Sequence, residues 1–256
     1  MKLLYLGHAG ILVKHQGTTV AIDPFISGSF LWNGKINVYR GESPWIGKEG
    51  SIQRFIDAFG AQIDAVAITH AHLDHFDPPT IMALINHDLE IQVIAPYPVV
   101  DWLQASSILD PAITKFLAPV MWNETLTVEG PGGELEVIVM PNPGIPRESR
   151  PYRVGYLVAP PSKPGVAHVG DAHSNGPWEH CRSRVKSLVT WGRKDRIETI
   201  NYFKPHGLLS TWWIHWERFI PGNFTCSQDP DIFVNDARAA GVESGVLDYK
   251  TWTDAW

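Results

Sequence analysis

The chain has 256 residues, of which 44% are hydrophobic and 19% are charged. This composition excludes a disordered or fibrous protein and predicts a globular chain with a sizeable core. The net charge of −6 argues against a general nucleic-acid-binding surface. At this length we expect a single domain over residues 1–256, with an aromatic extension at residues 226–256.

The ends of the chain and its cysteines bear on location and assembly. The segment MKLLYLGHAGILVKH is apolar but lacks the basic region and the cleavage site of a signal peptide. Cys181 and Cys226 form no CxxC motif, which favours a reducing compartment. We expect a cytoplasmic protein that has no membrane or nucleic-acid partner and acts on a small molecule. Trp252 and Trp256 are typical of docking groups, either on the domain itself or on a second copy in a homo-oligomer.

The first quarter of the chain predicts short strands followed by a helix. Strands are expected at residues 2–6, 11–15 and 18–22, with a hairpin turn at Gly17. The long segment that follows, FISGSFLWNGKINVYRGESPWIGKEG, is expected to be a loop that forms a wall or lid over a site. SIQRFIDAF predicts a helix with Ser51 as its N-cap, and it leads into a buried strand, DAVAIT.

Strands and helices then alternate along the rest of the chain. Helices are predicted for PPTIMALINH, PVVDWLQASS, KDRIETINYF and DPDIFVNDARAAG. Strands are predicted for EIQVIAP, TKFLAP, ETLTVEG, ELEVIVMP, RVGYLVAP, GVAHVG, SLVTW and GLLSTWWIHWERF. Two strand-rich halves divide near residue 112, which predicts two sheets packed face to face with helices on both outer faces.

Four side chains that commonly bind metals lie close together in the stretch THAHLDH. His70 and His72 project to the same face of the strand end, and the following turn can bring Asp74 and His75 beside them. Two neighbouring pockets can therefore share this segment. Imidazole and carboxylate ligands suit zinc, manganese or iron. The alternative, histidines that cluster without a metal, is much less typical of this pattern.

THAHLDH resembles the signature of the metallo-β-lactamase superfamily, and other segments agree with it in order over residues 1–225. They are LGHAGILVKHQGTTVAIDP, HVGDAHSN and IHWERFIPGNF. The combination of GHAG, GDAHSN and IHWERF is most similar to the L-ascorbate-6-phosphate lactonase group. The resemblance implies an α/β fold, an αββα four-layer sandwich with a metal-dependent hydrolytic site at one edge.

The resemblance also implies a ligand set. His70 and His72 would bind a first metal, and Asp74 and His75 a second. Asp171 would bridge the two ions. The last ligand of the second site would be His215, with His206 as its competitor. Asp23 would either orient a histidine from behind or cap a turn.

One departure from the superfamily concerns the first metal. The superfamily provides a further histidine after the strand that corresponds to ELEVIVMP, but here the segment reads PNPGIPRES. We therefore expect either one well-bound divalent ion or a pair of which one is labile, with zinc, manganese or iron as the metal.

The expected reaction is hydrolysis of a small lactone, ester or phosphoester by a metal-activated water. Asp74 would hold the nucleophile and take its proton, and His173 would contact the substrate or transfer a proton. The further candidates for substrate contact are His8, Trp32, Arg147, Arg150 and Trp213. Arg153 belongs to the same group of arginines, which could bind a phosphate or carboxylate of the substrate and which also fit solvated loop charges. His8 also fits a turn histidine that bonds to the backbone, and the tryptophans also fit core packing.

Two rival functions remain open. Histidine and carboxylate ligands also suit iron, so the chain is compatible with an iron-dependent, oxygen-using tailoring enzyme. The missing histidine is compatible with a non-catalytic scaffold that has kept the fold.

Overall fold

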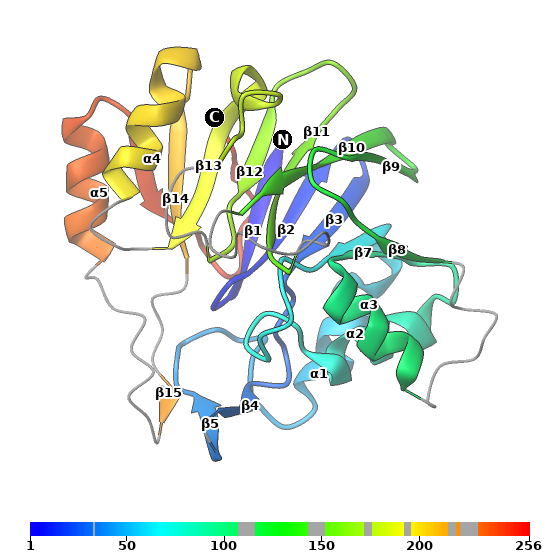
Figure 1. The fold of residues 1–256 in the computed structure, drawn as a ribbon. Helices are drawn as coiled ribbons and strands as arrows, with labels where there is room; N and C mark the ends of the chain where they lie inside the picture. The colour runs from blue at the N-terminus through cyan, green and yellow to red at the C-terminus, as the bar shows by residue number, and fades with distance from the viewer. Residues whose placement is uncertain are drawn as a thin grey trace.

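The computed structural model describes residues 1–32, 34–106, 116–142, 152–171, 176–191, 196–214, 219–220 and 230–256. Two seven-stranded sheets face each other, with α1, α2 and α3 on one side of the pair and α4 and α5 on the other (Figure 1). The predicted αββα sandwich is therefore confirmed.

The first sheet has the order β17-β1-β2-β3-β6-β7-β8. The strands are β1 (Lys2–Gly7), β2 (Gly10–His15), β3 (Thr18–Ile22), β6 (Ala65–Ala67), β7 (Gln92–Ala95), β8 (Leu117–Pro119) and β17 (Thr253–Asp254). β1 to β3 form an antiparallel meander, and β3, β6, β7 and β8 run parallel to one another. The hairpin turn between β2 and β3 needs a positive φ at Gly17, which is 130°, as the sequence predicts.

The second sheet has the order β16-β14-β13-β12-β11-β10-β9. The strands are β9 (Thr125–Gly130), β10 (Gly133–Pro141), β11 (Val154–Ala159), β12 (Gly165–His168), β13 (Val185–Trp191), β14 (Ser210–Ile214) and β16 (Glu243–Val246). β12, β13, β14 and β16 run parallel, so their carboxyl ends meet at one edge. Within the segment 226–256, the described residues form one outer helix and two strands. One of these strands, β16, lies in the second sheet, and the other, β17, lies in the first sheet.

Helices cover the outer faces of both sheets. The α-helices are α1 (Ser51–Phe59), α2 (Pro78–His87), α3 (Tyr97–Ala105), α4 (Arg196–Phe203) and α5 (Pro230–Ala239). Short 3₁₀ helices are η1 (Gly60–Gln62), η3 (Arg182–Arg184) and η4 (Lys204–His206). None of the helices within the described ranges is long and apolar enough to cross a membrane.

Three apolar clusters correspond to the three interfaces between the four layers. The middle cluster lies between the sheets and includes Tyr5, Val137 and Val189. The second joins α1, α2 and α3 to the first sheet, and the third joins α4 and α5 to the second sheet. Burial of these apolar side chains is the main favourable term that holds the layers together.

Two local predictions are wrong. The segment expected to be a loop contains a hairpin, β4 (Ser29–Trp32) and β5 (Lys35–Tyr39), which pairs with β15 (Phe219–Ile220) in a small third sheet (Figure 1). Ser51 is not the N-cap of α1: Gly50 takes that position in a left-handed conformation, and the Ser51 hydroxyl donates to the Ile26 carbonyl at 3.1 Å.

Candidate metal centre

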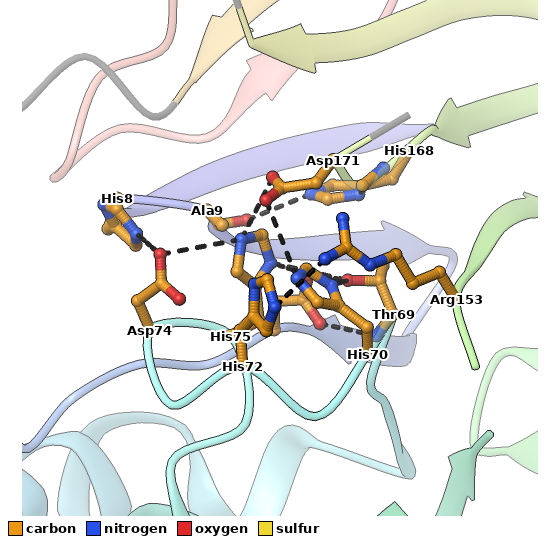
Figure 2. A network of polar contacts seen from close by, with 12 residues as sticks. His8, Ala9, Thr69, His70, His72, Asp74, His75, Arg153, His168 and Asp171 are labelled. Carbon is orange, nitrogen blue, oxygen red and sulfur yellow. Dashed lines mark hydrogen bonds and ion pairs between the residues drawn. The ribbon is translucent and has the colours of Figure 1, made fainter. Parts of the chain in front are cut away.

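The clustered histidines and carboxylates lie where several strands end at the same edge of the sandwich. His8 follows β1, Asp23 follows β3, and the stretch from His70 to His75 follows β6. Asp171 follows β12 of the second sheet and reaches the same place (Figure 2). Residues far apart in the sequence converge because the carboxyl ends of these strands share one edge.

A tight turn brings the second half of the THAHLDH stretch back beside the first. The His72 carbonyl accepts hydrogen bonds from the amides of His75 and Phe76, at 2.9 and 2.7 Å. The His70 ring centroid then lies 4.5 Å from that of His72 and 4.2 Å from that of His75. The turn predicted from the sequence is therefore present.

The second pocket consists of His8, Asp74 and His75, all three buried, with one ligand atom from each within 4.8 Å of the others. His8 Nε2 lies 3.0 Å from Asp74 Oδ2. His75 Nε2 lies 3.9 Å from the same oxygen and 3.2 Å from Asp171 Oδ1. This arrangement directs two carboxylates and two imidazoles toward one small volume.

Asp23 supports the second pocket from behind. Its Oδ2 lies 2.7 Å from His75 Nδ1, and its two oxygens accept hydrogen bonds from the Thr69 amide at 2.7 Å and the Thr69 hydroxyl at 2.6 Å. A carboxylate that accepts from Nδ1 leaves Nε2 directed into the pocket. This geometry matches the orienting role that the resemblance implies for Asp23.

The pKa values of the two inner histidines move in opposite directions. Burial lowers the pKa of His70 well below its usual value, so this imidazole is neutral. Burial also opposes the charge on His75, but the carboxylates of Asp171, Asp23 and Asp74 outweigh it and raise the pKa of His75 to about 10. Without a metal, His75 therefore holds a proton that a metal has to displace.

The first pocket consists of His70, His72 and Asp171, again with one ligand atom from each within 4.8 Å of the others. His70 Nδ1 lies 3.0 Å from the Thr69 hydroxyl, and His70 Nε2 lies 3.6 Å from Asp171 Oδ2. His72 is partly exposed, and its Nε2 lies 3.0 Å from Arg153 Nη2 (Figure 2). Burial and the nearby guanidinium both lower the pKa of His72.

His168 connects the turn after β1 to the loop that carries Asp171. Its Nε2 donates to the Ala9 carbonyl at 3.0 Å, and its Nδ1 accepts from the Gly170 amide at 3.1 Å. Burial lowers the pKa of His168, which favours the neutral form that these two bonds require. His168 thus links the two sheets close to Asp171 (Figure 2).

Other residues suggested by the sequence lie elsewhere or outside the described ranges. Trp213 is 1% exposed and packs against Phe233 in the outer core, with a ring-centroid distance of 4.4 Å, which fits the alternative of core packing; its substrate contact stays a prediction. The described backbone of β4 includes Trp32, but its side chain is outside the described part. His173, His215, Arg147 and Arg150 also lie outside the described residues.

His206 lies at the opposite edge of the second sheet. It ends η4, just before β14, and its carbonyl accepts from Lys186 Nζ near the start of β13. Asp171 lies beyond the other, carboxyl ends of these parallel strands. His206 therefore lies away from Asp171, and His215 as the last ligand stays a prediction.

The sequence interpretation did not include Thr69 in the centre, and it gave His8 only as a substrate contact. It grouped Arg153 with Arg147 and Arg150 as arginines for a phosphate or carboxylate of the substrate, without a contact to His72. Thr69 directly precedes His70 in the motif, so its position beside the ligands could have been predicted from the sequence. The contact of Arg153 with His72 had no signal in the sequence, because it depends on the pairing of the Arg153 backbone with His70.

Comparisons with known proteins agree with the fold. A family model described as "Beta-lactamase superfamily domain" matches residues 18–189. A UPF0173 metal-dependent hydrolase of Anoxybacillus flavithermus is 31% identical over 103 residues, which are 40% of this chain and 35% of that protein. The match thus spans about a third of the relative's length.

Two solved structures are similar over nearly the whole chain. Igni18, a metallo hydrolase of Ignicoccus hospitalis, is 20% identical with a TM-score of 0.68, and the match covers 98% of this chain and 97% of that one. CmlA, a diiron β-hydroxylase of Streptomyces venezuelae, is 18% identical with a TM-score of 0.60 over 98% of this chain and 53% of that one. At these identities the likeness shows the fold. Because the family model covers more than half of the chain, from β3 to β13, the protein belongs to the beta-lactamase superfamily.

Proposed function

We propose that this protein is a metal-dependent hydrolase that acts on a small lactone, ester or phosphoester. The observation that carries the proposal is the convergence of two groups of histidine and aspartate ligand atoms at one edge of the sandwich. The names of the hydrolase relatives support the reaction class, and the GHAG and GDAHSN motifs support a lactonase-like substrate.

The second pocket fits a divalent ion. His75 Nε2 and the carboxylates of Asp74 and Asp171 face one another inside the protein, and imidazole and carboxylate ligands suit zinc, manganese or iron. His215 is proposed as the remaining ligand, because β14 ends at Ile214 on the same edge as Asp171. Cys181 is buried in the outer core with a pKa raised to about 12 by burial, so it supplies no thiolate to the centre.

A divalent ion supplies Lewis-acid chemistry when bound, because it lowers the pKa of water and polarises a carbonyl or phosphoryl oxygen. Asp74 is the group that we propose holds the attacking water and accepts its proton. His8 keeps the Asp74 carboxylate in place through its contact at 3.0 Å. His173, two residues after Asp171, is proposed to contact the substrate or transfer a proton.

The experiment is a panel of lactones, phosphodiesters and thioesters, assayed with protein that has been freed of metal and reloaded with manganese, zinc or iron. Turnover that is abolished by chelation and restored by one metal is the expected result. If no substrate in the panel turns over with any metal, the hydrolase proposal fails. Activity that is abolished by chelation and restored by metal also excludes a scaffold without catalytic function.

The second candidate is an iron-dependent, oxygen-using enzyme. The observation that favours it is the mixed histidine and carboxylate ligand set, which suits iron as well as zinc. Iron retained through purification, together with substrate-dependent oxygen consumption, would select this candidate. Hydrolysis under anaerobic conditions would exclude it.

A cytoplasmic location and a homo-oligomeric state are part of the same proposal. Size-exclusion chromatography with light scattering tests the second of these directly.

A further inference from the structure

We propose that the Arg153 guanidinium replaces a metal ion in the first pocket, so that the centre holds one tightly bound ion, in the second pocket. This inference rests on the proposed function, because it concerns how many ions the same centre takes.

The hydrogen bond from Arg153 to His72 removes a metal ligand. A guanidinium carries only N–H donors, so at 3.0 Å the His72 Nε2 has to be the acceptor. In a neutral imidazole whose Nε2 accepts, the proton lies on Nδ1, and neither nitrogen then has a lone pair left for a metal. The usual support for a metal-binding histidine is the reverse: a carboxylate or carbonyl that accepts from the second nitrogen, as Asp23 does for His75.

The backbone fixes the position of Arg153. His70 and Arg153 form an isolated antiparallel bridge, and the Val154 amide donates to the Thr69 carbonyl at 2.9 Å. The guanidinium therefore starts from a strand end that is held against the ligand segment itself. To load the first pocket, an ion has to break the contact with His72 and accept a permanent positive charge beside it.

The histidine-free segment after β10 fits this arrangement. A pocket that lacks one imidazole, and whose His72 is bound to an arginine, retains only His70 and Asp171 among the residues that the structure describes. The guanidinium supplies a positive charge there without a metal, and its other N–H groups are suited to an oxygen atom of the substrate.

Metal stoichiometry, measured by elemental analysis and by cobalt titration followed by visible absorption, tests the inference. The wild-type protein is expected to bind one equivalent tightly. Arg153→His, which adds an imidazole and removes the cation, is expected to tighten a second equivalent at least ~tenfold. Arg153→Lys is the matched control: it keeps a cationic donor and is expected to remain at one equivalent.

Nitrogen-15 NMR of the metal-free protein gives a second readout that does not depend on metal loading. The His72 ring is expected to show a protonated Nδ1 and an accepting Nε2 in the wild type, and to lose this preference in Arg153→Ala. Two tight equivalents in the wild type, or the opposite tautomer of His72, would overturn the inference and leave the hydrolase proposal intact. Failure to bind any metal would overturn both.

Discussion

The two pockets share one ligand segment but differ in what surrounds them. In the second pocket, His8, Asp74 and His75 are buried, and Asp23 supports His75 from behind. In the first pocket, His72 and Asp171 are partly exposed, and a guanidinium contacts the imidazole that would bind a metal. Ligand spacing in a motif therefore does not determine whether a pocket takes an ion, because the charge of the neighbouring groups decides whether the lone pairs are available.

The largest expected effect is on the second pocket itself. Asp74→Ala should lower the bound metal to under about a tenth of an equivalent and reduce kcat/KM about 10³-fold, because it removes both a ligand and the proposed base. Elemental analysis and initial rates measure these changes. Asp101→Ala, an exposed carboxylate on α3, is the control and should leave both unchanged. Equal metal content in the two variants would contradict the proposal that the second pocket holds the metal.

A smaller loss is expected from the residue behind the second pocket. Asp23→Asn should weaken metal binding about 10- to 100-fold, because the neutral amide no longer favours the N–H of His75 Nδ1. Calorimetric titration measures the affinity. The matched control is Asp64→Asn: Asp64 accepts from the Thr19 amide at 2.7 Å at the start of β6, so its loss should affect only stability. A similar affinity loss in both variants would show that the effect is not local.

The pH dependence of metal binding tests the electrostatics of the second pocket. The pKa of His75 is raised to about 10 in the folded, metal-free protein, from about 6.5 when unfolded. Because the metal competes with this proton, apparent affinity should rise up to about tenfold per pH unit between pH ~7 and ~9, with about one proton released per ion.

The raised pKa of His75 also makes the folding stability depend on pH, but in the opposite direction to the metal affinity. The folded pKa lies above the unfolded value, so the stabilisation from His75 is fully present below pH ~6.5 and is lost as the pH rises toward about 10. Calorimetry in buffers of different ionisation enthalpy checks the proton release, and denaturation of the metal-free protein checks the stability. An affinity that does not change with pH would exclude His75 as a ligand.

The smallest functional effect is expected away from both pockets. Trp213→Phe should cost about 1 kcal/mol of stability or somewhat more, because the side chain is buried against Phe233, and it should leave KM unchanged. Urea denaturation and steady-state kinetics provide the measurements. A raised KM at unchanged stability would instead support the predicted substrate contact of Trp213.

Local patterns predicted much of the fold and part of the centre. The short apolar runs and the turn at Gly17 predicted the first three strands, and the helical spacing in SIQRFIDAF predicted α1. The β4–β5 hairpin was not predicted, because its partner β15 lies 180 or more residues further along the chain. The two neighbouring tryptophans of β14 could not be distinguished either: Trp212 faces the space between the sheets and Trp213 faces α5, and only the sheet packing decides which face is which.

By itself, the sequence predicted the fold class, through its strand and helix pattern and the resemblance of motifs spread over residues 1–225. It also located the ligand-rich segment from His70 to His75, because each of these signals lies in a short stretch of sequence. Only the tertiary structure decided what each ligand faces. Asp23 approaches His75 across 52 positions, and Arg153 approaches His72 across 81. Carboxylate support in one pocket and a guanidinium in the other depend on which strand ends meet at the edge of the sandwich, and no short-range pattern contains that information.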